Sequence, residues 1–422
     1  MTPTARKKNL VTRFFSTLGP GLITGAADDD PSGVATYTIA GAQLGTTLLW
    51  TAFITWPLMA CVQFMCARIG MVTGRGLAGA LRQRIPSWML IIAACALFAA
   101  NSINVGADLS GMADAAEMLT GLNSHWFVVP FGVGIAYWTV RCRYYQIAKI
   151  LKWLALCLFA YVLTAFVVRP DWNSILRDTF VPRWPKDHDT WQSLVAILGT
   201  TISPYLFFWQ SSQEVEYEKA MGRQMRVQRE GATSREIIDR KLDVGTGTFF
   251  SNLVMYFIIL TAAVTLHAHG VTNIETSKQA AEALKPLTGS LAYFLYTAGL
   301  IGVGFLAIPT LTGSAAYAFA ETFKWREGLD QSFKGARSFY TVLIVSTLVG
   351  IAMDFFDINP VRTLFWTAVI NGVLAPFLLV GILYVACDRK LMQNQPSSTL
   401  SRIIVAITTL VMFAAAIGMF VL

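Results

Sequence analysis

The chain has 422 residues, of which 55% are hydrophobic and only 14% are charged. Its mean hydropathy of +0.52 is far above that of a soluble protein of average composition, which predicts an all-α integral membrane protein embedded in a lipid bilayer. The net charge of +8 follows from membrane topology, as the loop charges below indicate, and we expect no nucleic-acid partner.

Apolar runs of roughly 20 residues, the length that crosses a bilayer, predict eleven transmembrane spans. They lie near residues 17–43, 47–67, 88–113, 125–140, 145–168, 190–216, 243–266, 287–320, 338–356, 361–386 and 402–421. With the N-terminus inside, 26 of the 33 Lys and Arg residues fall on the cytoplasmic side. We therefore predict a cytoplasmic N-terminus (1–13), a single transmembrane domain (14–422) and an outside C-terminus, in a bacterial inner membrane.

The first span carries three consecutive acids, Asp28, Asp29 and Asp30, in the middle of an apolar run. Ionisable groups at membrane depth mark an ion or substrate path. Pro31 removes a backbone donor and Gly33 permits non-helical backbone, so we expect a broken helix that lines a cavity. A solvated Asp-Pro turn between two short helices is the alternative interpretation.

The third span carries polar residues at intervals that place them on one helical face, namely Asn101, Ser102, Asn104 and Asp108. Such a stripe faces a bundle interior or water. For the two asparagines, hydrogen bonding between helices is an equally good interpretation.

The sixth span is interrupted like the first. Small polar residues and Pro204 break it between Gly199 and Tyr205. Two interrupted spans at the start of two groups of five indicate inverted repeats with a binding site between them. We predict one repeat at about 14–168, a second at about 190–386 and an extra helix at 402–421.

These two segments resemble the Nramp family of divalent metal transporters. The stretch GPGLITGAADDDPSGVATYTIAGAQLG is similar to the family's first helix, which carries an Asp-Pro-Gly-Asn motif, and the sixth span is similar to the helix with a Met-Pro-His motif. The resemblance covers essentially the whole chain. It implies a LeuT-type fold of eleven helices, arranged as a 5+5 inverted repeat plus one, with helices 1 and 6 broken. It also implies alternating-access transport of a metal substrate, no enzymatic activity, no cofactor and no protein partner.

The resemblance implies a metal site made by Asp30 and the backbone carbonyl of Thr200. Gly33 stands where the family has a ligand Asn, Ser203 where it has a ligand Met, and Tyr205 where it has His. Losing the thioether removes the soft ligand, and losing the Asn side chain leaves room for the waters that magnesium retains. Both changes resemble an Nramp-related branch associated with magnesium transport. We therefore expect a hard ion, Mg2+ or Mn2+, bound by Asp30, Thr200 and Ser203.

Further polar residues are candidates for a proton or cation path, namely Asp28, Asp29, Asp108, Tyr205 and Asn371. Asp28 and Asp29 lie on the outer side of the break, or at the C-terminal end of a half-helix, where they concentrate cations; alternatively, one carries a coupled proton. Asp108 lies near an acid of the family's proton pathway, whereas the missing motif His argues against proton coupling, so coupling stays open. In helix 10 the local match places Leu374, not Asn371, where the family has a polar residue near the metal.

Three alternatives remain from the sequence. One is a proton-coupled Mn2+ or Fe2+ transporter like typical family members. Another is a Na+-coupled organic-solute symporter of the same fold, although three aspartates would repel a substrate carboxylate. The third is an intramembrane aspartyl protease in which Asp30 and Asp108 form the dyad.

Overall fold

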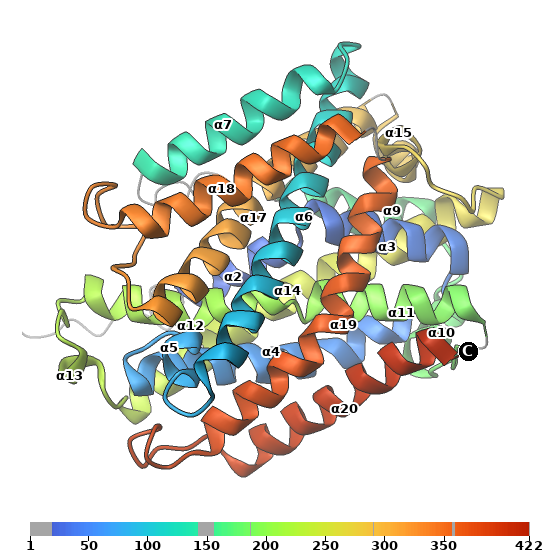
Figure 1. The fold of residues 1–422 in the computed structure, drawn as a ribbon. Coiled ribbons are helices and arrows are strands. Elements are labelled where there is room, and N and C mark those ends of the chain that lie inside the picture. Colours follow the sequence, from blue (N-terminus) through green and yellow to red (C-terminus); the bar gives the residue numbers. More distant parts are fainter. Residues whose placement is uncertain (1–18, 142–155, 186, 290, 357–358, 422) are drawn as a thin grey trace, which may run out of the picture.

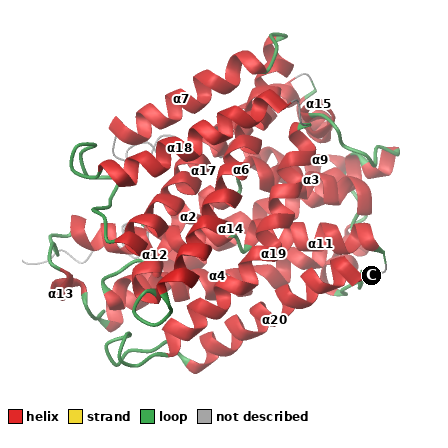
Figure 2. Ribbon diagram, viewed as in Figure 1, coloured by secondary structure: helices red, strands yellow, loops and turns green. Residues whose placement is uncertain are grey.

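The computed structural model describes residues 19–141, 156–185, 187–289, 291–356 and 359–421, and within these ranges the chain forms helices and no strand (Figures 1 and 2). The predicted all-α class is confirmed. The α-helices are α2 (Pro20–Asp28), α3 (Pro31–Leu44), α4 (Leu49–Thr73), α5 (Leu77–Leu81), α6 (Ser87–Thr120), α7 (His125–Arg141), α9 (Ala160–Val168), α10 (Trp172–Phe180), α11 (His188–Thr201), α12 (Pro204–Ala220), α13 (Arg226–Arg229), α14 (Ser234–Thr265), α15 (Ser277–Ala281), α16 (Lys285–Thr288), α17 (Leu291–Phe323), α18 (Arg337–Met353), α19 (Pro360–Cys387) and α20 (Thr399–Val421).

Seven helices in the described part of the chain are long and apolar enough to cross a membrane, namely α4, α6, α14, α17, α18, α19 and α20. Two further segments are interrupted, α2 before α3 and α11 before α12, so each half is shorter than a full span. The total of eleven spans stays a prediction, because residues 145–155 of the fifth predicted span lie outside the described residues. The predicted cytoplasmic N-terminus, 1–13, also lies outside them.

Helix α14 packs along α2, α3 and α4 (Figure 1). The backbones of α14 and α2 are in direct contact. A Cβ added to Gly25 of α2 would lie 2.4 Å from the carbonyl oxygen of Gly247 in α14. A Cβ on Gly247 would lie 2.4 Å from the carbonyl oxygen of Gly21. Small residues permit this close approach between membrane helices, so α2 is seated directly on the backbone of α14.

Adding a single methyl group at this contact is predicted to lower the stability of the fold strongly. Gly25→Ala is expected to destabilise the fold by at least the ~1–3 kcal/mol typical of overpacking, because the added Cβ meets main-chain atoms that cannot rotate away. Thermal unfolding of the purified protein in detergent measures the change. The matched control is Gly134→Ala in α7, where a Cβ meets no atom of the described residues within 4 Å. Equal unfolding temperatures for the two variants would show that α2 does not need this approach.

The first turn of α2 is held by a carboxylate from α14. Asp243 is fully buried, and it accepts hydrogen bonds from the backbone amides of Gly19 and Gly21 at 2.8 Å and of Leu22 at 3.1 Å. These are amides that a helix N-terminus leaves without internal partners, and a negative charge suits that end of the helix dipole. Asp243 therefore caps α2 from another helix.

Asp243 is also part of a buried ion-pair network. Arg240 lies 2.5 Å from Asp243 and 2.8 Å from Glu214 of α12. Gln210 donates to the other oxygen of Glu214 at 2.7 Å. The network therefore ties α2, the first half of one broken helix, to α12, the second half of the other.

Candidate metal-binding site

Both helix breaks lie where the sequence predicts them, and a proline follows each. Asp30 (ψ 170°) and Ser203 (ψ 134°) have extended backbone, the conformation that a following proline favours at the preceding residue. Pro31 and Pro204 then begin α3 and α12, at the first helical position, where a missing N–H does no harm. The carbonyl ends of α2 and α11 and the amide ends of α3 and α12 meet around these two breaks.

Asp30 lies at the junction and exposes only 2% of its surface. Its Oδ1 accepts the backbone amide of Gly33 at 2.7 Å and so caps α3. Its Oδ2 accepts Nδ2 of Asn104 from α6 at 3.1 Å and lies 3.5 Å from the hydroxyl of Tyr205 on α12. One oxygen is thus committed to the helix cap, and the other faces α6 and α12.

Ser203 and Thr200 occupy the second break. The Ser203 hydroxyl lies 2.7 Å from the carbonyl oxygens of both Gly199 and Thr200, to which it donates. Its oxygen lone pairs stay available, and the Thr200 carbonyl keeps one lone pair for a further partner. Both residues are buried, so this break offers two hard oxygen donors close to the end of α11.

Gly33 brings the start of α3 against the end of α11. A Cβ at Gly33 would lie 3.1 Å from Oγ1 of Thr200 and 3.4 Å from Cε2 of Tyr37. The space predicted to open where the family's Asn side chain is missing is therefore taken up by Thr200 and Tyr37 in this arrangement. Room for retained waters would need these two side chains to move.

Tyr205 makes a contact that its motif position does not predict. Its hydroxyl donates to the carbonyl of Ala27 at 3.1 Å, near the end of α2. The residue that replaces the family's His thus joins α12 to α2 through a hydrogen bond. It offers an oxygen in place of an imidazole nitrogen.

Asp28 and Asp29 lie at the C-terminal end of α2, one of the two positions expected for them. Asp28 is the last helical residue and Asp29 is the cap. Ser251 of α14 donates to Oδ2 of Asp28 at 2.6 Å and approaches Oδ1 of Asp29 at 3.2 Å. Both acids are buried, and Oδ1 of Asp28 has no hydrogen-bond partner among the described residues. Ser251 was not singled out by the sequence, because it is one of several polar residues in this part of span 7, with Thr246, Thr248 and Asn252.

The polar stripe of α6 divides between two roles. Asn104 faces Asp30, whereas Asn101 donates to the carbonyl of Leu311 in α17 at 2.8 Å. Asp108 is fully buried and close enough to Asp30 to interact electrostatically, with the Ser32 amide nearby. Within the described ranges, neither of its oxygens has a hydrogen-bond partner of normal geometry.

The side chains of Asn371 and Ser32 make no hydrogen bond to Asp30 among the described residues. Asn371 is buried in α19, and among the described residues it makes no hydrogen bond to Asp30 and leaves its Oδ1 without a partner. The Ser32 hydroxyl donates to the carbonyl of Leu364 in α19 at 2.7 Å, which fastens α3 to that helix.

The groups around Asp30 are carboxylate, carboxamide, hydroxyl and carbonyl groups. No three His, Cys, Asp or Glu side chains converge on a metal-sized space in the part of the chain that the structure describes. A cation beside Asp30 would therefore meet at most two such side chains among the described residues, and its other ligands would be neutral oxygens. Such ligands suit Mg2+, Ca2+ and Mn2+ better than soft transition metals.

Comparisons with known proteins give a consistent picture. The chain matches the family model described as "Nramp: Natural resistance-associated macrophage protein-like" over residues 21–422. A protein of Caldanaerobacter subterraneus named "Divalent metal cation transporter MntH" is 26% identical over 421 residues, which cover 94% of this chain and 92% of the relative. A protein of the same name from Deinococcus radiodurans is 26% identical over 398 residues, with 90% and 84% covered.

Solved structures agree on the fold. The Eremococcus coleocola manganese transporter, in complex with an aromatic bis-isothiourea substituted compound, matches with a TM-score of 0.78 at 16% identity, covering 98% of this chain and 87% of that one. MhsT in complex with L-phenylalanine matches with a TM-score of 0.60 at 14% identity, covering 94% and 98%. The predicted LeuT-type fold is thereby confirmed.

Proposed function

The chain belongs to the Nramp family, and on this premise we propose that it is a divalent metal cation transporter that carries a hard ion, Mg2+ or Mn2+, by alternating access. The observation that carries the proposal is the position of Asp30 at the break between α2 and α3, where its Oδ2 lies 3.1 Å from Nδ2 of Asn104 and 3.5 Å from the hydroxyl of Tyr205 on the other broken helix. Ser203 offers a hydroxyl where a thioether would favour softer metals. The names of the MntH relatives and of the manganese transporter support a divalent metal as the substrate class.

In this proposal Asp30, the Thr200 carbonyl and Ser203 hold the ion. Asp30 exposes 2%, Thr200 3% and Ser203 1% of their surfaces, so an ion reaches them only when the half-helices move. Oδ1 of Asp30 stays fixed by α3, while Oδ2 exchanges its weak contacts with Asn104 and Tyr205 for the ion. Burial strengthens the attraction between ion and carboxylate, because the surroundings screen it less than water does.

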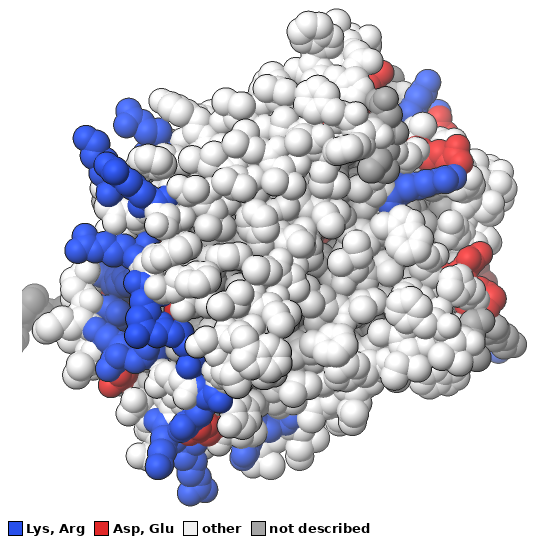
Figure 3. Space-filling model, viewed as in Figure 1, with Lys and Arg blue, Asp and Glu red and all other residues white. Residues whose placement is uncertain are grey.

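The distribution of charge supports an orientation for the molecule. Figure 3 shows Lys and Arg gathered at one end, the end at which Figure 1 places α5 and α13, with a broad uncharged belt beside it. The positive-inside rule assigns that end to the cytoplasm. We accordingly propose a bacterial inner-membrane location with the C-terminus outside.

A competition assay in proteoliposomes tests the substrate class. Mn2+ uptake by the purified protein should be inhibited by excess Mg2+ and only weakly by Cd2+, because the described ligands are hard. Labelled amino acids offered with a Na+ gradient should not enter. Na+-driven amino-acid uptake without metal uptake would replace the proposal with the symporter alternative.

The Ser203 hydroxyl gives a prediction about selectivity. Ser203→Met and the smaller Ser203→Cys should each raise uptake of Cd2+ relative to Mg2+ by about tenfold, because each adds a soft sulfur ligand beside Asp30. Ser203→Ala, which removes the hydroxyl without adding sulfur, is the matched control and should not favour Cd2+. Initial rates for the two ions measure the ratio. An unchanged ratio in both sulfur variants would show that Ser203 does not contact the ion.

A further inference from the structure

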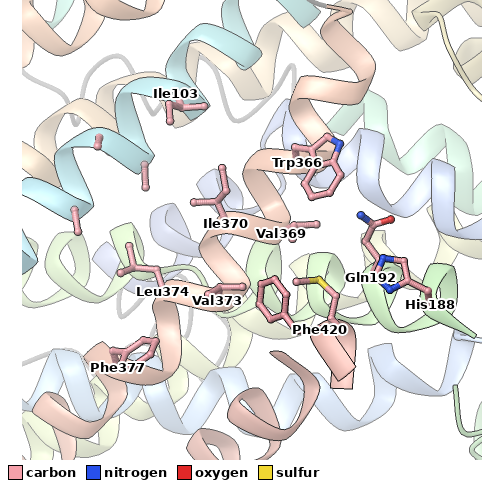
Figure 4. A pocket seen from close by; sticks show the side chains of 14 residues that line it. Ile103, His188, Gln192, Trp366, Val369, Ile370, Val373, Leu374, Phe377 and Phe420 are labelled. Atoms are coloured by element: carbon pink, nitrogen blue, oxygen red, sulfur yellow. The ribbon is translucent and has the colours of Figure 1, made fainter. Parts of the chain in front are cut away.

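A groove of about 550 Å³ runs along α19 between α6 and α20 (Figure 4). Its floor is formed by Val369, Ile370, Val373 and Leu374 of α19, and its walls are alanine-rich α6 and the end of α20. Among the described residues that line it, His188 and Gln192 of α11 are the only strongly polar ones, and both lie at one end.

The groove opens toward the lipid. Figure 3, seen from the same side as Figure 1, shows α6, α19 and α20 within the uncharged belt between the two charged ends. Large apolar side chains at the groove remain exposed, among them Ile370 (40%), Phe377 (62%) and Phe420 (74%). Surface of this kind is stable only against hydrocarbon, so the groove lies where an acyl chain can enter it.

Its length matches one leaflet of a bilayer. Trp366 and Phe377 line the groove and lie eleven residues apart on α19, which corresponds to about 16 Å at a rise of ~1.5 Å per residue. The hydrocarbon core is about 30 Å thick, so one leaflet contributes about half of that. Figure 1 places α11, which carries His188 and Gln192, toward the end of the molecule opposite α5 and α13, where a headgroup of the outer leaflet would lie.

The polar end of the groove presents both hydrogen-bond donors and carboxylates. His188 and Gln192 are four residues apart on one helix face and offer hydrogen-bond donors. Asp187 caps α11 by accepting the Thr190 amide at 2.9 Å, and Asp189 lies in the first turn. Donors suit phosphate and ester oxygens, whereas the two carboxylates suit an ammonium group and repel a headgroup that is only anionic.

We propose that this groove binds a single zwitterionic phospholipid of the outer leaflet. One acyl chain lies on α19, the phosphate and ester oxygens accept hydrogen bonds from His188 and Gln192, and the ammonium faces Asp187 and Asp189. The proposal rests on the orientation given above and does not depend on which ion is carried.

The other face of α19 connects the groove to the second helix break. A Cβ on Gly372 would lie 2.4 Å from the carbonyl oxygen of Val195 in α11, and one on Gly199 would lie 2.0 Å from that of Ala368. The helix that forms the groove floor is therefore in backbone contact with α11 at Gly199, the residue before Thr200. A lipid bound on α19 thus contacts one member of the pair formed by α11 and α19, which has to move during transport.

Native mass spectrometry of the purified protein, without metal and after adding phosphatidylethanolamine or phosphatidylglycerol, tests the proposal. The parent should retain a single phosphatidylethanolamine in preference to phosphatidylglycerol. Val373→Trp fills the groove and should lower retention by about tenfold. Val380→Trp, on the same helix but outside the groove and 51% exposed in the parent, is the matched control and should retain lipid.

A separate experiment tests the roles of His188 and Gln192. His188→Ala combined with Gln192→Ala should remove the preference for phosphatidylethanolamine. Equal retention by the two tryptophan variants, with equal unfolding temperatures, would overturn the groove as the site, and a parent that prefers phosphatidylglycerol would overturn the zwitterionic occupant. Because no metal is present, these outcomes are independent of whether the protein transports Mg2+ or Mn2+.

Discussion

Asp30→Asn is expected to abolish uptake of the divalent ion, with a rate lowered by roughly 100-fold or more, since even losing an outer-shell partner of a metal site costs 10–100-fold. Asparagine caps helices about as well as aspartate, so the bond from the Gly33 amide survives and α3 still forms. The change therefore removes the negative charge with little effect on the fold. Initial uptake rates in proteoliposomes measure the loss of transport, and the unfolding temperature of each protein shows whether the fold is kept.

Asp171→Asn is the matched control for that experiment. Asp171 caps α10, where it accepts the Asn173 amide at 3.1 Å and the Ser174 hydroxyl at 2.7 Å on the exposed surface. This variant should transport like the parent. A stable Asp30→Asn protein that still carries the ion would remove Asp30 from the site.

Asp243→Ala is expected to lower the free energy of unfolding by about 3–5 kcal/mol, the range found when one member of a buried ion pair is removed. The substitution leaves Glu214 as the one carboxylate paired with Arg240 among the described residues, and it deprives the Gly19, Gly21 and Leu22 amides of their common acceptor. Buried groups that lose their partners carry the full penalty of desolvation. Chemical or thermal unfolding in detergent measures the loss.

The exposed pair on the same helix provides the comparison. Asp239 lies 3.9 Å from Arg235, with both side chains partly exposed. Asp239→Ala should change stability by less than ~1 kcal/mol, as surface ion pairs do. If Asp243→Ala proves no more harmful than Asp239→Ala, the network does not hold α2 in place.

The helix breaks could be predicted from the sequence because their signals are local. A proline disfavours helical backbone at the residue before it. Proline alone does not break a helix, however, because Pro57, Pro130, Pro309 and Pro376 lie inside α4, α7, α17 and α19. At Asp30 and Ser203, small and polar residues accompany the proline, and there the backbone is extended. The Asp30 cap follows in the same way from its position one residue before the helix.

The partners of the acids could not be predicted, because they come from distant parts of the chain. Ser251 is separated from Asp28 by 223 residues, and Asp243 from Gly21 by 222. Which helices become neighbours decides these contacts. The same holds for Asn101 and Asn104, whose spacing in α6 is equally compatible with a site and with helix packing. In the structure Asn101 bonds to a neighbouring helix, and Asn104 bonds to Asp30.

The space beside Gly33 shows a second limit of reasoning from the sequence. A missing side chain predicts a larger site, yet Thr200 and Tyr37 occupy the space beside Gly33. Packing in a protein interior leaves few voids, so neighbours take up what one residue vacates. Room for a hydrated ion therefore depends on how the half-helices open, which composition alone does not determine.

Uptake of Mg2+ into proteoliposomes, with the internal pH recorded at the same time, tests the central claim most directly. We predict that the parent carries Mg2+, or Mn2+ offered beside it, and that Asp30→Asn carries neither. Uptake of Cd2+ in preference to both ions, or uptake of either ion by a stable Asp30→Asn protein, would contradict this claim. The internal pH shows whether protons are coupled: acidification would indicate coupling even though Tyr205 stands in place of the motif histidine, and a steady pH would indicate its absence.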